Sequence, residues 1–183
     1  MGKRASYYSG RSDEPLIGLT MGEVLDDTVA NHPDDESLVS VHQGLRYTYQ
    51  EFAQVCTQVA KGLIGLGIEK GDNIAIWATN RADWMITQFA AAKIGATLVV
   101  INPTYRVYEL EHALNLSQTK ALLLIDRYKT SDYISMFYQT CPEAKDAKER
   151  EISSERLPSL KSAVVMGEKS YPGMLSWREL IEK

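Results

Sequence analysis

The chain has 183 residues, of which 44% are hydrophobic, so it is long enough to form one domain around a buried core. Its 24 acidic residues outnumber 20 lysines and arginines, and the formal net charge of −4 gives no reason to expect nucleic-acid binding. No apolar run approaches the roughly 20 residues that cross a bilayer, and residues 1–10 contain no secretory signal, so we expect a cytoplasmic protein without a transmembrane segment. We therefore expect its two cysteines to be free thiols.

The N-terminal third predicts an arm, two helices and a hairpin. Residues 1–18 are polar and aperiodic, which predicts a flexible arm followed by one α/β unit over residues 19–183. Helices are predicted after Thr20 and Thr48, because each threonine is followed three residues later by a glutamate, the pattern of a capping box. We expect Val24 and Leu25 to face the core. Between the helices, an apolar run and a turn predict a β-hairpin; its key residues are Leu38, Val39, Val41 and Gly44.

Three continuously apolar runs follow, separated by helical patterns. Strands that are apolar at every position are typical of a parallel sheet with both faces covered. The order strand, helix, strand, helix, strand predicts an α/β fold with a doubly wound, mainly parallel sheet and helices on both faces. Asn80 is expected to cap the first of these helices, which Gly95 closes. The predicted strands are Ile74–Trp77, Thr97–Ile101 and Ala121–Ile125, and the predicted helices lie within residues 81–94 and 107–114.

The C-terminal part has weaker patterns. A helix is predicted from Thr130 or Ser131 to Pro142, followed by a charge-rich segment, residues 143–156, that we expect to be a solvated surface. Residues 162–166 predict another strand. Ser176, with a glutamate three residues on, opens a last helix close to the end of the chain.

No constellation of catalytic residues is evident. The sequence has no P-loop, no paired histidines and no G-x-S-x-G elbow, so we assign no catalytic residue and no metal site. Ligands of open α/β sheets bind beyond the carboxyl ends of the strands, which directs attention to residues 78–81, 102–106 and 126–129. The alternative is that Asn80, Asn102 and Asp126 only cap helices and form turns.

Two segments resemble a known family. Arg46–Phe52 (RYTYQEF) resembles the first core motif of the adenylate-forming enzymes, and Ala92–Pro103 (AKIGATLVVINP) resembles the second, in the correct order and spacing. The stretches 104–123 and 154–166 resemble the fatty-acid branch, especially the medium-chain acyl-CoA synthetases. The resemblance covers about residues 20 to 180. It implies the N-terminal α/β subdomain of an enzyme that uses ATP, Mg²⁺ and CoA to convert a fatty acid to acyl-CoA through an acyl-adenylate.

The resemblance also implies what this chain lacks. The family's Ser/Thr/Gly-rich phosphate loop, which ends in lysine, and the catalytic lysine of its C-terminal domain have no counterpart here. We therefore expect a truncated chain that does not adenylate on its own, binds no cofactor by itself, and self-associates through surface that the rest of the enzyme would cover. The alternatives are another adenylate-forming enzyme, or a stand-alone, non-catalytic α/β binding module.

Two basic residues follow the third predicted strand. In the acetyl-CoA synthetases, basic residues at a comparable place meet the phosphates of the CoA nucleotide, so the resemblance implies this role for Arg127 and Lys129. The alternative is that both are solvated surface charges.

Overall fold

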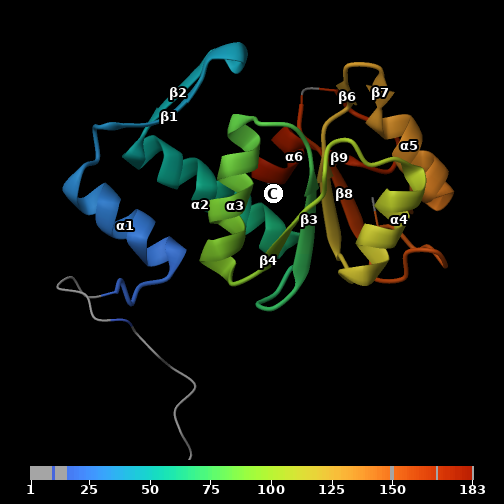
Figure 1. The fold of residues 1–183 in the computed structure, drawn as a ribbon, viewed down its shortest axis with the longest axis horizontal. Helices are drawn as coiled ribbons and strands as arrows, with labels where there is room; N and C mark the ends of the chain where they lie inside the picture. Colours follow the sequence, from blue (N-terminus) through green and yellow to red (C-terminus); the bar gives the residue numbers. More distant parts are fainter. Residues whose placement is uncertain (1–9, 11–15, 149–150, 168, 183) are drawn as a thin grey trace, which may run out of the picture.

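The computed structural model describes residue 10 and residues 16–148, 151–167 and 169–182. Most of the arm that we expected over residues 1–18 lies outside the described residues. From residue 19 onward, the described residues form an α/β layer structure in which one sheet runs through the centre (Figure 1).

The central sheet has five strands, all parallel, in the order β4-β3-β5-β8-β9. Burial explains the continuous apolar runs, because every residue of β5 and β8 is buried. The predicted parallel sheet is confirmed, and β9 is a short strand that the sequence did not reveal. The strands are β3 (Asn73–Trp77), β4 (Thr97–Val100), β5 (Ala121–Leu124), β8 (Ser162–Val165) and β9 (Leu175–Ser176).

Helices cover both faces of the sheet, as predicted. On one face α2 packs against α3 and α6, and on the other α4 packs against α5 (Figure 1). The first helix, α1, lies outside this layer against α2 and α3. The helices are α1 (Met21–Asn31), α2 (Tyr49–Gly65), α3 (Ala82–Ile94), α4 (Val107–Leu116), α5 (Tyr133–Thr140) and α6 (Trp177–Ile181).

The strand order creates a switch point at β3. The chain leaves β3 for β4 on one side and returns to β5 on the other, so β3 lies between them. An aromatic stack closes this point: the Trp77 and Tyr133 rings lie 4.0 Å apart and nearly parallel, and neither side chain is exposed. Trp77 Nε1 donates to the Asn102 carbonyl (3.2 Å), and Tyr133 Oη donates to the Pro103 carbonyl (2.6 Å). Burial raises the pKa of Tyr133, so this hydroxyl remains a donor.

Local sequence signals account for most element boundaries. All three predicted capping boxes are present, at Thr20, Thr48 and Ser176. The predicted hairpin is also present: Gly44 adopts a φ of 66°, which a side chain would disfavour, between the two antiparallel strands. Its elements are β1 (Glu36–Ser40), the 3₁₀ turn η1 (Val41–Gln43) and β2 (Leu45–Thr48).

Several expectations were wrong in detail. Val24 is 37% exposed, and only Leu25 of that pair is buried, because α1 touches the layer along a narrow face. Helix α5 begins later than expected: residues 127–132 first form a small hairpin, and Asp132 then caps the helix by accepting from the Ser135 N–H (2.9 Å). This hairpin comprises β6 (Arg127–Tyr128) and β7 (Ser131–Asp132).

The charge-rich segment after α5 is also more buried than expected. It begins with a 3₁₀ turn, η2 (Pro142–Asp146), and both Ala144 and Ile152 are completely buried. The charged residues that the structure describes in this segment are exposed, while Ala144 and Ile152 pack into the core.

Both cysteines are free thiols, as expected. Burial raises the pKa of Cys56 to about 12 and also raises that of Cys141, so neither is a reactive thiolate at neutral pH.

Candidate functional site

A large cleft opens beyond the carboxyl ends of β5 and β8, beside the switch point that the aromatic stack fills. Its volume is about 1080 Å³, at the upper end of what small-molecule sites show. Four segments line it: the β6–β7 hairpin, α5, η2 and the loop after β8. The lining residues are Asp126, Arg127, Tyr128, Lys129, Asp132, Ile134, Ser135, Tyr138, Gln139, Lys145, Lys169 and Tyr171.

The cleft contains both basic residues that the resemblance singled out. Arg127 lies on β6 with its side chain 69% exposed, and its Nη2 is 3.7 Å from the Asp132 carboxylate. Lys129 occupies the hairpin turn with a φ of 51°, and its ammonium lies 5.2 Å from the centre of the Tyr128 ring. Both are therefore held at the rim by local contacts, with donors left over for a ligand.

Asp126 fixes the loop that forms another wall of the cleft. Its Oδ2 accepts from the Lys169 ammonium and from the Tyr171 hydroxyl, each at 3.3 Å. Burial, together with the nearby Asp126 charge, raises the pKa of Tyr171, so its hydroxyl stays protonated and can donate. Asp126 thus holds the loop after β8 in place through these two bonds. This role goes beyond the helix-capping or turn-forming role that was the alternative.

Two further contacts hold the same loop. Tyr138 Oη donates to the Pro172 carbonyl (2.8 Å). Gly173 has a φ of 67°, and a Cβ there would lie 1.6 Å from the Ala144 carbonyl oxygen, so only glycine allows the loop to approach η2 this closely. The position of this loop is therefore fixed by its contacts with α5 and η2.

The other two edge loops do not reach this cleft. Asn102 Oδ1 accepts from the Thr104 N–H and hydroxyl, both at 2.9 Å, which is the turn-forming role of the alternative reading. Asn80 lines a separate small hollow of about 280 Å³ between the β1–β2 hairpin and the start of α3.

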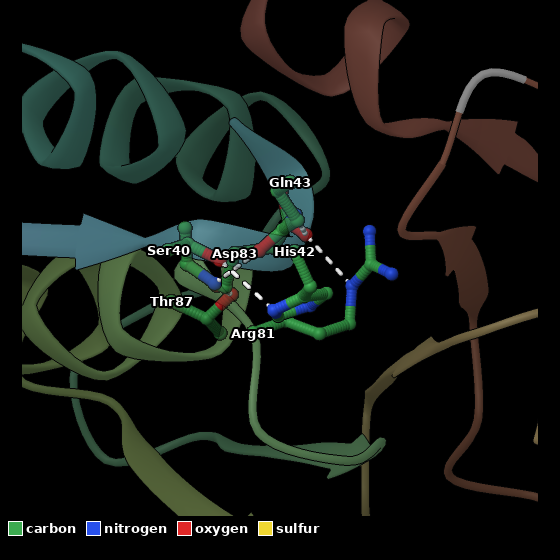
Figure 2. A network of polar contacts seen from close by, with 7 residues as sticks. Ser40, His42, Gln43, Arg81, Asp83 and Thr87 are labelled. Carbon is green, nitrogen blue, oxygen red and sulfur yellow. Dashed lines mark hydrogen bonds and ion pairs between the residues drawn. The ribbon is translucent and has the colours of Figure 1, made fainter. Parts of the chain in front are cut away.

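Beside this hollow, a hydrogen-bonded network joins the β1–β2 hairpin to the start of α3 (Figure 2). We call it the polar clamp; its members are Ser40, Gln43, Arg81, Ala82 and Asp83. We expected Asn80 to cap α3, but the cap position is Arg81, whose side chain makes no capping bond. Instead Gln43 Oε1 accepts from the Ala82 N–H and from the Ser40 hydroxyl, both at 2.7 Å. The buried Asp83 carboxylate accepts from Gln43 Nε2 (3.0 Å) and Arg81 Nε (2.9 Å). These contacts fasten the hairpin to α3.

The sequence analysis identified only residues 126–129 of the cleft and missed the other eight of its twelve lining residues. Lys145, Lys169, Tyr138 and Tyr171 come from segments without a recognisable motif, and only the fold brings them to Arg127 and Lys129. Within the described residues, no group of three His, Cys, Asp or Glu side chains could hold a metal ion. The described helices include none that is long and apolar enough to span a membrane.

Comparison with known proteins gives a consistent result. A sequence model described as "AMP-binding enzyme" matches residues 25–179. The chain is 41% identical over 162 residues to the putative acyl-CoA synthetase YngI of Bacillus subtilis, covering 88% of this chain and 30% of that protein. It is 37% identical over 177 residues to the mitochondrial medium-chain acyl-CoA ligase ACSF2 of Danio rerio, covering 97% and 29%.

Solved structures share the fold. The anthranilate CoA ligase AuaEII, in complex with anthranoyl-AMP, matches 93% of this chain with a TM-score of 0.75 and 22% identity, over 29% of its own length. A putative long-chain-fatty-acid CoA ligase from Rhodopseudomonas palustris matches 88% of this chain with a TM-score of 0.72 and 22% identity, over 36% of its length. The chain thus spans about a third of these proteins, and it belongs to the AMP-binding enzyme family, with acyl-CoA synthetases as its relatives.

Proposed function

We propose that the chain forms the N-terminal α/β lobe of an ATP-dependent acyl-CoA synthetase. In this reaction a fatty acid and ATP give an acyl-adenylate and pyrophosphate, and the CoA thiol then displaces AMP to give acyl-CoA. The family match over residues 25–179, by a chain that spans 29–30% of its acyl-CoA synthetase relatives, is the observation that supports this. The name of the Danio rerio relative favours a medium-chain acid.

In this proposal the lobe contributes to CoA binding and not to adenylation. Stabilising the transferring phosphates of ATP requires preorganised cations and donors, including Mg²⁺ and a lysine-bearing phosphate loop. The sequence contains no such loop. The cleft instead presents Arg127 and Lys129, which suit the phosphates of the CoA nucleotide.

A chimera tests the assignment. Residues 20–181 replace the matching segment of the Bacillus subtilis relative, and ATP-dependent formation of octanoyl-CoA is measured. We expect the chimera to make the thioester, because the fold and the cleft are retained. A chimera that is folded by circular dichroism and yet makes no acyl-CoA from any fatty acid would contradict the proposal.

The CoA role has its own test in that chimera. Arg127→Glu is expected to raise the KM for CoA about tenfold or more, because it replaces a charge-assisted contact by repulsion, while the KM for the acid stays unchanged. Lys61→Glu, on the exposed side of α2 and away from the cleft, is the matched control. An unchanged KM for CoA in Arg127→Glu rejects the role.

Cytoplasmic localisation remains part of the proposal. The Danio rerio relative is named as mitochondrial, so membership of the family does not select the compartment. Fractionation of the source cells, with the chain detected by antibody, decides between the two.

A further inference from the structure

The hollow between the β1–β2 hairpin and the start of α3 is separate from the cleft and has no part in the proposed function. Its volume of about 280 Å³ is just below the range of drug-sized sites, so it suits a small ligand. We propose that it binds a short aliphatic carboxylate, with Arg81 holding the charged end and the hairpin covering the alkyl chain. This site goes beyond the proposed function and does not rest on it.

Arg81 supplies free hydrogen-bond donors at this hollow. Its Nε donates to the buried Asp83 carboxylate (2.9 Å), which fixes the guanidinium at the edge of the polar clamp. The Arg81 side chain is 25% exposed, and Figure 2 shows its two terminal nitrogens pointing away from the clamp. Neither Nη atom has a hydrogen-bond partner among the described residues. A guanidinium with both Nη groups free can bind a carboxylate through two parallel bonds.

The charge of the lining favours an anion. Among the described residues that line the hollow, only Arg81 and His42 have ionisable side chains, so no carboxylate of the lining competes for the Arg81 donors. Ser40 Oγ donates its proton to Gln43 Oε1 (2.7 Å), so His42 Nδ1, which lies 3.3 Å from Ser40 Oγ, is the donor in that contact. His42 Nε2 has no partner among the described residues and is left for the ligand.

Apolar side chains form the rest of the hollow. Leu38, Val39 and Val41 come from the hairpin, and Met85 comes from α3. Val41 is 85% exposed and Val39 is 37% exposed, so an alkyl chain that lies against them removes apolar area from water. This burial is favourable, and inorganic anions cannot make use of it. The guanidinium and the aliphatic wall together therefore favour an aliphatic carboxylate over phosphate or sulfate.

Such a ligand would join two elements of the fold. Val41 belongs to the hairpin and Arg81 precedes α3, so a ligand in contact with both reinforces the polar clamp between them. The Ala82 N–H, which donates to Gln43 Oε1 at 2.7 Å, should then exchange more slowly with solvent when the ligand is bound.

NMR titration of the 183-residue chain with hexanoate tests the inference. We expect amide shifts at residues 38–42 and 80–85, and none at residues 126–129 in the cleft. Hexan-1-ol lacks the charge and acetate lacks most of the alkyl chain, so each should bind about tenfold or more weakly than hexanoate. Arg81→Gln should weaken hexanoate binding about tenfold or more, because it removes two charge-assisted bonds.

A second variant leaves the polar clamp intact. Val41→Asp changes an exposed side chain, so the chain should fold, and the new carboxylate should abolish hexanoate binding by repulsion. Val100→Asp, at an exposed valine outside the lining of the hollow, is the matched control and should bind hexanoate as the original chain does.

Three results would overturn the inference: no shifts at the hollow, equal binding of hexan-1-ol, or unchanged hexanoate binding in Val41→Asp. A peptide with a C-terminal valine that binds the hollow more tightly than hexanoate would assign it to a protein partner, and this also contradicts the inference. None of these measurements uses the chimera, so their failure and the failure of the proposed function are distinguishable.

Discussion

The packing of α6 against α2 depends on the absence of a side chain at Gly62. Gly62 lies near the end of α2 with an ordinary helical φ, so alanine would suit its backbone and would stabilise an isolated helix by about 1 kcal/mol. In the folded chain, however, a Cβ at Gly62 would lie 2.0 Å from the backbone oxygen of Leu180. Because that oxygen belongs to the main chain, no rotamer change relieves the overlap, and α6 must move by more than 1 Å to restore ordinary contact.

The expected cost follows from what this movement uncovers. Leu180 is completely buried, and exposing such a side chain costs about 1.5–3 kcal/mol, while strain from overpacking costs about 1–3 kcal/mol when the helix stays in place. After the gain of about 1 kcal/mol in helix propensity, Gly62→Ala should destabilise the chain by roughly 0.5–2 kcal/mol. For a protein of this length the Tm should fall by roughly 1–8 °C.

The assay compares two alanine substitutions in helices. Gly22→Ala in α1 is the control, because its Cβ would meet the flexible Lys93 Cγ at 3.4 Å, and it should stay within about 1 kcal/mol of the original chain. Calorimetry gives Tm, and hydrogen exchange of residues 177–181 should show lost protection only in Gly62→Ala. A Gly62→Ala chain as stable as the original, with α6 still protected, would refute the packing argument.

Three further predictions concern the clamp, the response to acid and the sheet edge. Gln43→Ala should cost about 1–3 kcal/mol by calorimetry, because it removes the cap of α3 and a bond to the buried Asp83, whereas Gln54→Ala on exposed α2 surface should not. The Lys120 ammonium, bonded at 2.7 Å, and a backbone N–H hold the pKa of Asp72 below its ordinary value of 3.8. The stability that Asp72 contributes is present above that value and lost as pH falls through the lowered pKa, so Asp72→Asn should be less stable at pH 7 and respond less to acid, and equal acid profiles would contradict this. Strand β4 is an edge of the sheet with Val100 59% exposed, so the chain should self-associate in analytical ultracentrifugation, and Val100→Lys should reduce this; a monomer at every concentration contradicts it.

Local signals were enough to predict most elements of the fold. The capping boxes at Thr20, Thr48 and Ser176 act within four residues, and β5 is apolar at every position, so both can be recognised without tertiary information. The strand order could not be derived in this way. A βαβαβ pattern does not say whether β5 lies beyond β4 or on the other side of β3.

The errors arose where a residue that is distant in the sequence makes a contact that we had assigned to a neighbouring residue. Asn80 is next to the start of α3, but the capping oxygen comes from Gln43, which lies 39 residues before the capped amide. The cleft shows the same limit. The rule that ligands bind at carboxyl ends of strands located residues 126–129, and the family resemblance singled out Arg127 and Lys129 among them, whereas Lys145 lies in a segment that resembles solvated surface. Only its packing between α5 and the loop after β8 brings it to the cleft.

The most direct measurement is octanoate-dependent ATP–pyrophosphate exchange, recorded side by side for the 183-residue chain and for the chimera with the Bacillus subtilis relative. We expect no exchange by the chain, which has no phosphate-binding loop, and clear exchange by the chimera, in which that loop is present. Exchange by the chain alone would show that this lobe performs adenylation, and a folded chimera without exchange would show that it does not serve an acyl-CoA synthetase.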